Sequence, residues 1–259
     1  MIARRVLLLA VLMTAACASA WGQVTVAITG LPPIGVAATQ PSAAVTLSGP
    51  SPVATTGTLT LAFTPAGGGT QAFDAKFASG SPYTAGFSIA AGSTQALFGT
   101  APSIPVMIGT VAGTITITTS IQSSTLTPPA PFVMTVNPTV PVITSVIPCA
   151  ITLSGFSISV TGRSTPRNMT SALFHFTLPT NTQPPTLDVT VPLTAAFAGW
   201  YSNSNSNAFG STFKMTVQFS FTGPPGTTVP FVAVTGSLTN SIGTSNPPVE
   251  GQSSLATCP

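Results

Sequence analysis

Apolar and polar side chains alternate along most of the chain with a period of two residues. In residues 58–64 (TLTLAFT) the odd positions carry large apolar side chains and the even positions carry Thr or Ala, and residues 113–118 (GTITIT) repeat this order. Successive side chains of a β-strand point to opposite faces, so the period predicts strands with one buried and one solvated face. Threonine on the solvated face favours an extended backbone without adding charge.

The same pattern predicts strands from end to end of the chain. In the first half they fall at residues 23–29, 43–48, 58–64, 71–77, 86–90, 94–98, 113–118 and 132–136. In the second half they fall at residues 142–147, 155–161, 171–178, 186–191, 213–222 and 231–239. Turn clusters rich in Gly and Pro separate them at a spacing that suits a β-sandwich and leaves no room for the helices of a βαβ unit. We expect only one short helical turn, near residues 194–200.

One segment, residues 137–141 (NPTVP), stands out as a domain boundary. Prolines near both of its ends favour an extended, semi-rigid connection that cannot belong to a central strand. We therefore predict an all-β protein of two tandem immunoglobulin-like antiparallel β-sandwiches, at residues 21–137 and 142–259, joined by a linker at 138–141. Each half then has about the size of one immunoglobulin-like domain.

The composition supports this class and excludes two others. Only 3% of the 259 residues are charged, whereas helices in water normally fill their outer face with charged and amide side chains. A mainly helical protein is therefore excluded. Disorder requires low hydrophobicity and high net charge, whereas here the mean hydropathy is +0.52 and the net charge is only +3. A disordered chain is therefore excluded as well.

The N-terminus has the features of a secretory signal peptide. Arg4 and Arg5 precede an apolar run at residues 6–16, and residues 18–20 (ASA) supply the small residues that signal peptidase needs. We expect cleavage after residue 20. The apolar run is too short to span a membrane, and hydroxylated residues interrupt every later apolar stretch, so no transmembrane anchor is expected in the mature chain.

Cleavage would also remove two of the basic residues. The charged residues that remain are Lys76, Arg163, Arg167, Lys214, Asp74, Asp188 and Glu250. They give the mature chain a net charge of about +1 and form no basic stripe that could neutralise several phosphates. Nucleic-acid binding is therefore not expected.

Signal-peptide cleavage would also remove one of the three cysteines. Cys17 leaves with the signal peptide, unless residues 14–17 (TAAC) serve as a lipoprotein cleavage box and Cys17 is lipidated. Cys149 and Cys258 remain, in an oxidising compartment where disulfides persist. We expect them to pair, closing a loop that contributes about 4 to 5 kcal/mol in the chain-entropy model. Two buried free thiols are the alternative.

Several segments resemble a family of uncharacterised secreted proteins of soil bacteria that are built from immunoglobulin-like sandwiches. The resemblance lies in residues 141–145 (PVITS), 162–167 (GRSTPR), 200–202 (WYS), 209–211 (FGS) and 238–244 (LTNSIGT), and in residues 89–96 (IAAGSTQA) and 109–115 (GTVAGTI). It covers most of the mature chain and implies an extracellular or surface protein, with no catalytic residues to carry over. Cys149 and Cys258 do not belong to the family pattern, so the predicted disulfide rests on the compartment alone.

Trp200 and Tyr201, followed by the Ser/Asn run at residues 202–207, are the most suggestive candidate site. An exposed aromatic side chain beside amides and hydroxyls is suited to binding sugars, with Trp200, Tyr201, Asn203 and Asn205 as ligand contacts. The other interpretation, which we favour from the sequence, makes Trp200 the core tryptophan of the second sandwich and the Ser/Asn run a solvated loop.

His175 is the only histidine, so any general-base or metal role would depend on it. In residues 172–176 (ALFHF) alternation places Phe174 and Phe176 in the core and His175 outward. No acidic residue lies at a ligand-like or triad-like spacing from it. We expect a solvated strand histidine without a catalytic role.

Arg167 follows a predicted turn in the second half. With carboxylates so scarce, we expect it to form a structural ion pair with Asp188 or to hydrogen-bond backbone carbonyls and hold the loop, as the guanidinium geometry allows. An anion site is the remaining possibility for Arg163 and Arg167.

Few charged residues are available to protect the edges of the sheets. Edge strands usually avoid sheet-to-sheet pairing through Lys, other charges, bulges or covering loops. Either prolines alone protect these edges or the chain associates with itself.

These features predict a secreted or cell-surface protein, with the periplasm as a further location, that acts without catalysis, metal or cofactor. We expect a structural or adhesive component of the bacterial cell envelope that contacts envelope or extracellular proteins, or copies of itself. The alternative is a carbohydrate-binding module that binds glycans through Trp200, Tyr201 and the Ser/Asn-rich loop.

Overall fold

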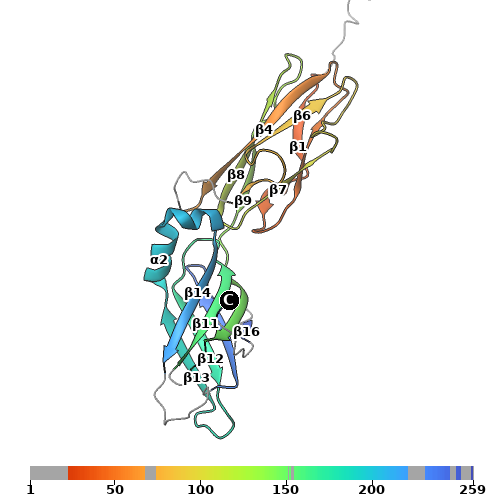
Figure 1. Cartoon of the computed structure of the whole chain (residues 1–259). Coiled ribbons are helices and arrows are strands. Elements are labelled where there is room, and N and C mark those ends of the chain that lie inside the picture. Colours follow the sequence, from red (N-terminus) through yellow and green to blue (C-terminus); the bar gives the residue numbers. More distant parts are fainter. Residues whose placement is uncertain are drawn as a thin grey trace, which may run out of the picture.

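The computed structural model describes residues 23–67, 74–150, 152, 155–220, 231–245, 249–251 and 258. The predicted signal peptide with Cys17 and the start of the strand predicted at 71–77 lie outside the described residues. Two β-sandwiches are stacked end to end in an elongated molecule (Figure 1). The prediction of an all-β fold of immunoglobulin-like sandwiches is confirmed.

The first sandwich consists of two sheets. One has the strand order β1-β3-β7-β5, with β1 Val26–Thr29, β3 Ser42–Leu47, β7 Ile104–Met107 and β5 Lys76–Phe77. The other has the order β2-β9-β8-β4-β6, with β2 Ile34–Gly35, β9 Phe132–Val136, β8 Gly113–Ile121, β4 Thr55–Pro65 and β6 Thr84–Ile89. All their strand pairs are antiparallel except β2 with β9, which is parallel.

Alternation in β4 and β8 separates a core face from a solvated face. Leu61 lies opposite Ile117 in the register, and both side chains are buried in the first core. The next pair, Thr60 and Thr118, points outward and is exposed. The period-two pattern therefore identified the buried face of these strands correctly.

The second sandwich has a three-stranded and a four-stranded sheet. The first has the order β10-β11-β14, with β10 Val142–Cys149, β11 Gly155–Arg163 and β14 Thr212–Ser220. The second has the order β13-β12-β15-β16, with β13 Thr186–Pro192, β12 Ser171–Thr177, β15 Ala233–Thr239 and β16 Val249–Gly251. Phenylalanine rings from both sheets, among them Phe156, Phe174 and Phe176, form the centre of its core.

Several strands differ from the sequence prediction: β2, β7 and β16 were not predicted, and one predicted strand is absent. Residues 94–98 form only isolated bridges, such as Ser88 with Leu97, instead of a strand. β7 was missed because Pro105 interrupts its apolar pattern, yet Val106 and Ile104 are buried in the core. Tertiary packing thus outweighs local strand propensity at both places.

The helical turn expected near residues 194–200 is present and longer than predicted. The helix α2, Thr194–Ser202, is followed by the 3₁₀ helix η1, Ser204–Phe209. The Asn203 side chain accepts a hydrogen bond from the backbone N–H of Asn205 and so caps η1. Figure 1 shows α2 at the end of the second sandwich that faces the first.

Cys149, at the end of β10, forms a disulfide with Cys258, and their Cα atoms are 4.9 Å apart. The bond ties the end of the chain to the first strand of the second sandwich. Across the described ranges, no helix has the length and apolar character needed to cross a membrane.

Candidate functional site

The two sandwiches are joined by hydrogen bonds as well as by the chain. The backbone N–H of Ala112 donates to the carbonyl oxygen of Thr165 at 2.8 Å. In the segment between β9 and β10, the N–H of Thr139 donates to the Thr165 hydroxyl at 2.7 Å, and the Thr139 carbonyl accepts from the Asn240 amide at 2.8 Å. The boundary is therefore a bonded interface between loops of both domains.

A buried polar cluster lies at the centre of this interface. Thr110 donates from its N–H and its hydroxyl to one carboxylate oxygen of Asp74, at 2.9 and 2.7 Å. Ser211 of the second domain then donates from its N–H to the Thr110 hydroxyl and from its own hydroxyl to the Thr110 carbonyl, at 2.8 and 2.7 Å. Because this cluster is fully or partly buried, its bonds are more costly to leave unmade than those at the surface.

Glycine is required at two positions of this polar cluster. Gly210 has a φ of 59°, and a Cβ atom there would lie 2.5 Å from both the Asp74 carboxylate and the Thr110 hydroxyl. Gly109 has a φ of 79°, and its Cβ would lie 2.4 Å from the other Asp74 carboxylate oxygen. Both positions therefore need a residue without a side chain.

Arg167 lies beside this cluster and holds α2 and η1 against the boundary. Its Nη2 donates to the Tyr201 carbonyl, the Ser206 hydroxyl and the Asn207 side-chain oxygen, at 3.2, 2.6 and 3.3 Å. Its guanidinium also lies over the Tyr201 ring, 5.0 Å from the centroid. Burial lowers the pKa of Arg167 from its usual value, while the neighbouring Tyr201 and Asp74 oppose that shift.

Tyr201 is a structural residue of the same interface. Its hydroxyl donates to the Ser211 carbonyl at 2.7 Å. Burial raises the pKa of Tyr201 far above its usual value, and the nearby Arg167 only partly offsets this effect. Tyr201 therefore packs into this interface, where it is half-buried and lines the cleft between the domains.

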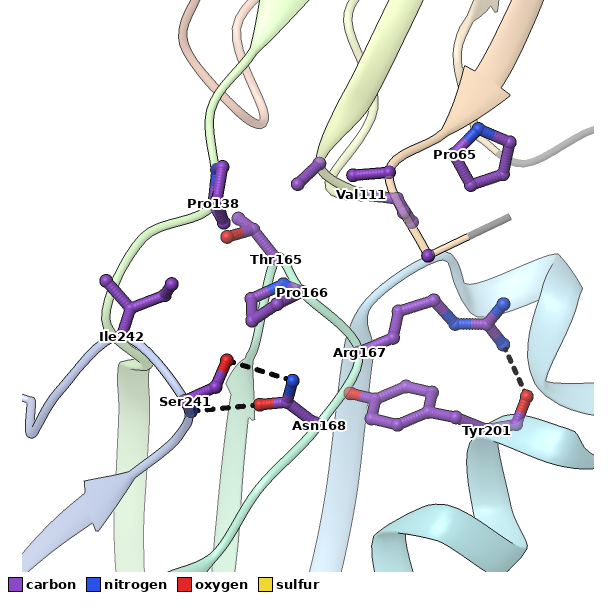
Figure 2. Close-up of a pocket in the computed structure, with 13 residues that line it drawn as sticks. Pro65, Val111, Pro138, Thr165, Pro166, Arg167, Asn168, Tyr201, Ser241 and Ile242 are labelled. Carbon is purple, nitrogen blue, oxygen red and sulfur yellow. Dashed lines mark hydrogen bonds between the residues drawn. The ribbon is translucent and has the colours of Figure 1, made fainter. Parts of the chain in front are cut away.

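An open cleft of about 510 Å³ lies between the domains (Figure 2). Apolar side chains, including Val111 and Ile242, line much of it. Of its polar side chains, Asn168 and Ser241 bond each other, with the Asn168 amide donating to the Ser241 hydroxyl at 3.0 Å and accepting from its N–H at 3.1 Å. These polar groups hold the loops of the second domain together.

Trp200 does not lie in the core. The interpretation of Trp200 as the core tryptophan of the second sandwich was therefore wrong. It projects from α2 with 36% of its surface exposed, and its ring lies 6.0 Å from that of Phe209, which is 56% exposed. Together with Phe213 and Lys214 these rings line a surface cavity of about 300 Å³. The structure thus has an exposed aromatic pair, with Phe209 in the place that the sequence assigned to Tyr201.

The two asparagines predicted as ligand contacts, Asn203 and Asn205, are exposed but do not line this cavity. The side chain of Asn203 is occupied in capping η1. The sequence could not identify Phe209, because only the turn between α2 and η1 brings it back toward Trp200.

The predicted ion pair between Arg167 and Asp188 is wrong. Arg167 lies at the domain boundary, where it bonds a backbone carbonyl as the other interpretation proposed. Asp188 lies on β13 directly opposite His175 of β12, and its carboxylate oxygen is 2.5 Å from His175 Nδ1. Strand register decides this partner, and spacing along the chain does not reveal it.

His175 therefore has an acidic partner that the sequence did not predict, although it points outward as expected. The side chains of His175 and Asp188 are 43% and 62% exposed, at an open groove of about 440 Å³ that Thr235 and Ser237 also line. Within the described ranges, no three His, Cys, Asp or Glu residues lie together as a metal would require. The pair is a surface pair in an open groove.

Comparison with known proteins assigns no family. No protein-family model matches the sequence, and a search of curated proteins finds no match. Among solved structures, the chain is similar to the class 5 fimbriae chaperone CfaA, with 9% identity over 88% of this chain and 99% of that chain and a TM-score of 0.27. It is also similar to titin domains A168–A170, with 11% identity over 90% and 66% of the two chains and a TM-score of 0.24. Chicken CNTN1 domains FN1–FN3 share 10% identity over 88% and 69%, with a TM-score of 0.23. At TM-scores this low, these similarities carry no functional argument.

Proposed function

We propose that the chain is a non-catalytic structural or adhesive protein of the bacterial cell envelope, exported by the N-terminal segment, that acts by protein–protein contact or self-assembly. The observation that carries the proposal is the outer face of the five-stranded sheet in the first domain. Its outward residues on β4 and β8 are hydroxylated or small and uncharged: Thr56, Thr58, Thr60, Ala62, Thr64, Thr114, Thr116, Thr118 and Ser120.

Such a face suits contact with another protein better than chemistry on a small substrate. A neutral surface of hydroxyls and methyl groups has little charge to desolvate when a partner covers it. The bonded domain boundary adds a second support, because it lets the two sandwiches act as one stiff unit. The charged side chains Asp74 and Arg167 are already engaged within that boundary.

The test is a charge placed at the centre of this face. Thr60 and Thr118 lie opposite each other and are exposed, so the double variant Thr60→Lys, Thr118→Lys should fold normally. We expect the wild-type protein in the envelope fraction, where a chemical cross-linker joins it to a partner chain or to itself, and we expect the double variant to reach the same fraction but to lose the cross-link. His175→Ala is the matched control and should keep both. A cytoplasmic wild-type protein, or a double variant that still cross-links, would contradict the proposal.

The exposed aromatic pair favours a second candidate, a carbohydrate-binding module. Sugar C–H groups stack on aromatic rings, and Trp200 and Phe209 present two rings beside a cavity of about 300 Å³. On a glycan array, this candidate predicts a signal that Trp200→Ala abolishes and His175→Ala retains. An array without any signal at high protein concentration would exclude it.

A further inference from the structure

β14 is a long outer strand, and no described strand pairs with one of its two edges. Its nine residues, Thr212–Ser220, pair along their whole length with β11, and among the described strands β14 has no other neighbour. Half of the backbone N–H and C=O groups of an edge strand point away from its partner and remain available to another strand. The sequence of β14 (TFKMTVQFS) contains no proline and a single charge.

Other outer strands in this molecule are protected or short. β13 carries Asp188 and ends at Pro192, and β10 contains Pro148. β6 is partly covered, because Ser88 and Leu97 exchange two backbone hydrogen bonds beside it. The outer strands β1, β2, β5 and β16 have two to four residues each. Among the described strands, β14 is therefore the long edge that has no proline or covering segment and only Lys214 as a protecting charge.

The inward face of β14 is also incompletely covered. Phe213 is buried, but Met215, Val217 and Phe219 are only partly buried although they pack against the second core. The core thus ends in half-exposed apolar side chains along this edge. A further strand beside β14 would cover them, and its backbone would pair with edge N–H and C=O groups that no described strand meets.

The residue order of β14 fits an antiparallel copy of itself. If two copies pair around a twofold axis at Thr216, Phe213 faces Phe219 and Met215 faces Val217. Lys214 then faces Gln218, so no like charges meet. A contact of this kind uses the same patch on both subunits, as closed dimers do.

We propose that β14 pairs with β14 of a second copy of this chain, so that two sheets of order β10-β11-β14 become one continuous sheet of six strands. This proposal rests on the self-assembly part of the proposed function, and it names the strand that forms the contact between the two copies. A second copy is the chosen partner because the strand matches itself in apolar order and in charge.

Opposite charges at the twofold position provide the test. In the full mature protein with its disulfide intact, Thr216 is exposed, so Thr216→Lys and Thr216→Glu should both fold. Each variant alone brings two like charges face to face and should weaken the dimer by about fivefold, measured by analytical ultracentrifugation. An equimolar mixture should restore or exceed the wild-type affinity, because Lys then faces Glu. Thr190→Lys on β13 is the matched control and should leave the dimer unchanged.

A second substitution tests the register. Gln218→Glu places a carboxylate opposite Lys214 of the other copy twice in each dimer and should tighten the dimer by a fewfold, whereas Gln218→Lys should weaken it. A wild-type protein that stays monomeric at high concentration, or a mixture of the Thr216 variants that does not recover, overturns the proposal. If Thr190→Lys loses the dimer while the Thr216 variants keep it, the contact lies at β13, and this result also overturns the proposal. None of these outcomes bears on contact with another envelope protein, which the lysine pair at Thr60 and Thr118 tests separately.

Discussion

Ser211 donates two hydrogen bonds to Thr110 across the boundary between the domains, although the two residues are 101 positions apart in the chain. Each residue offers both a backbone group and a hydroxyl, so the pair closes a small ring. Asp74 orients this ring by accepting from the N–H and the hydroxyl of Thr110. Two short polar side chains and one carboxylate thus join the two sandwiches.

Removing the Thr110 hydroxyl should loosen this boundary. Thr110→Val keeps the shape of the side chain but leaves the Ser211 N–H and part of the Asp74 carboxylate without a partner. A buried group left unsatisfied costs about 1 to 3 kcal/mol, so the free energy of unfolding should fall by that amount. Urea denaturation measures the loss, and small-angle scattering should show a wider range of interdomain angles. Thr118→Val, on the exposed sheet face, is the control, and an equal loss there would contradict the assignment.

Most of the contacts at the domain boundary could not be predicted from the sequence. Alternation identified the inward face of β4 and β8, because a strand of period two needs only its own residues to define its faces. The partner of Asp74 or of Asp188 depends on which loops and strands meet, which no local pattern states. The exposed Trp200 shows the same limit, because its position follows from the helix α2 and not from the residue type.

Gly210 gives a second test of how tightly the domains fit. Gly210→Ala would place a Cβ atom 2.5 Å from the Asp74 carboxylate and the Thr110 hydroxyl, so the boundary has to open or the polar cluster has to break. Gly80→Ala is the matched control, since Gly80 has a similar positive φ of 75° with nothing within 4 Å. The control should lose about 1 to 2 kcal/mol from backbone strain alone, and Gly210→Ala should lose about 1 to 3 kcal/mol more.

Limited proteolysis can follow the same pair of variants. We expect faster cleavage near the boundary in Gly210→Ala and wild-type cleavage there in Gly80→Ala. Equal losses in the free energy of unfolding of the two variants would mean that the close contact at Gly210 does not affect stability.

The disulfide between Cys149 and Cys258 should contribute strongly to the stability of the second domain. It closes a loop with a sequence separation of 109, for which the chain-entropy model gives about 4 to 5 kcal/mol. The double variant Cys149→Ser, Cys258→Ser should therefore unfold at a much lower urea concentration than the wild type. Reduction of the wild-type protein should produce the same shift, and reductant should have no effect on the double variant. A shift caused by reductant in that variant would show that the loss has another origin.

The buried hydroxyl of Tyr201 should make the protein sensitive to alkali. Because the pKa of Tyr201 is raised above the ordinary value of 10.0 in the folded state, the unfolded chain loses this proton first as pH rises. Its contribution is thus complete below about pH 10 and declines above it, by at most about 1.4 kcal/mol per pH unit. Tyr201→Phe should be less stable than wild type at pH 8, having lost the bond to the Ser211 carbonyl, but should decline less steeply between about pH 10 and 11.5. Ser211→Ala keeps the phenol and should retain the steep decline, so parallel curves for all three proteins, measured by urea denaturation at each pH, would show that Tyr201 is not the titrating group.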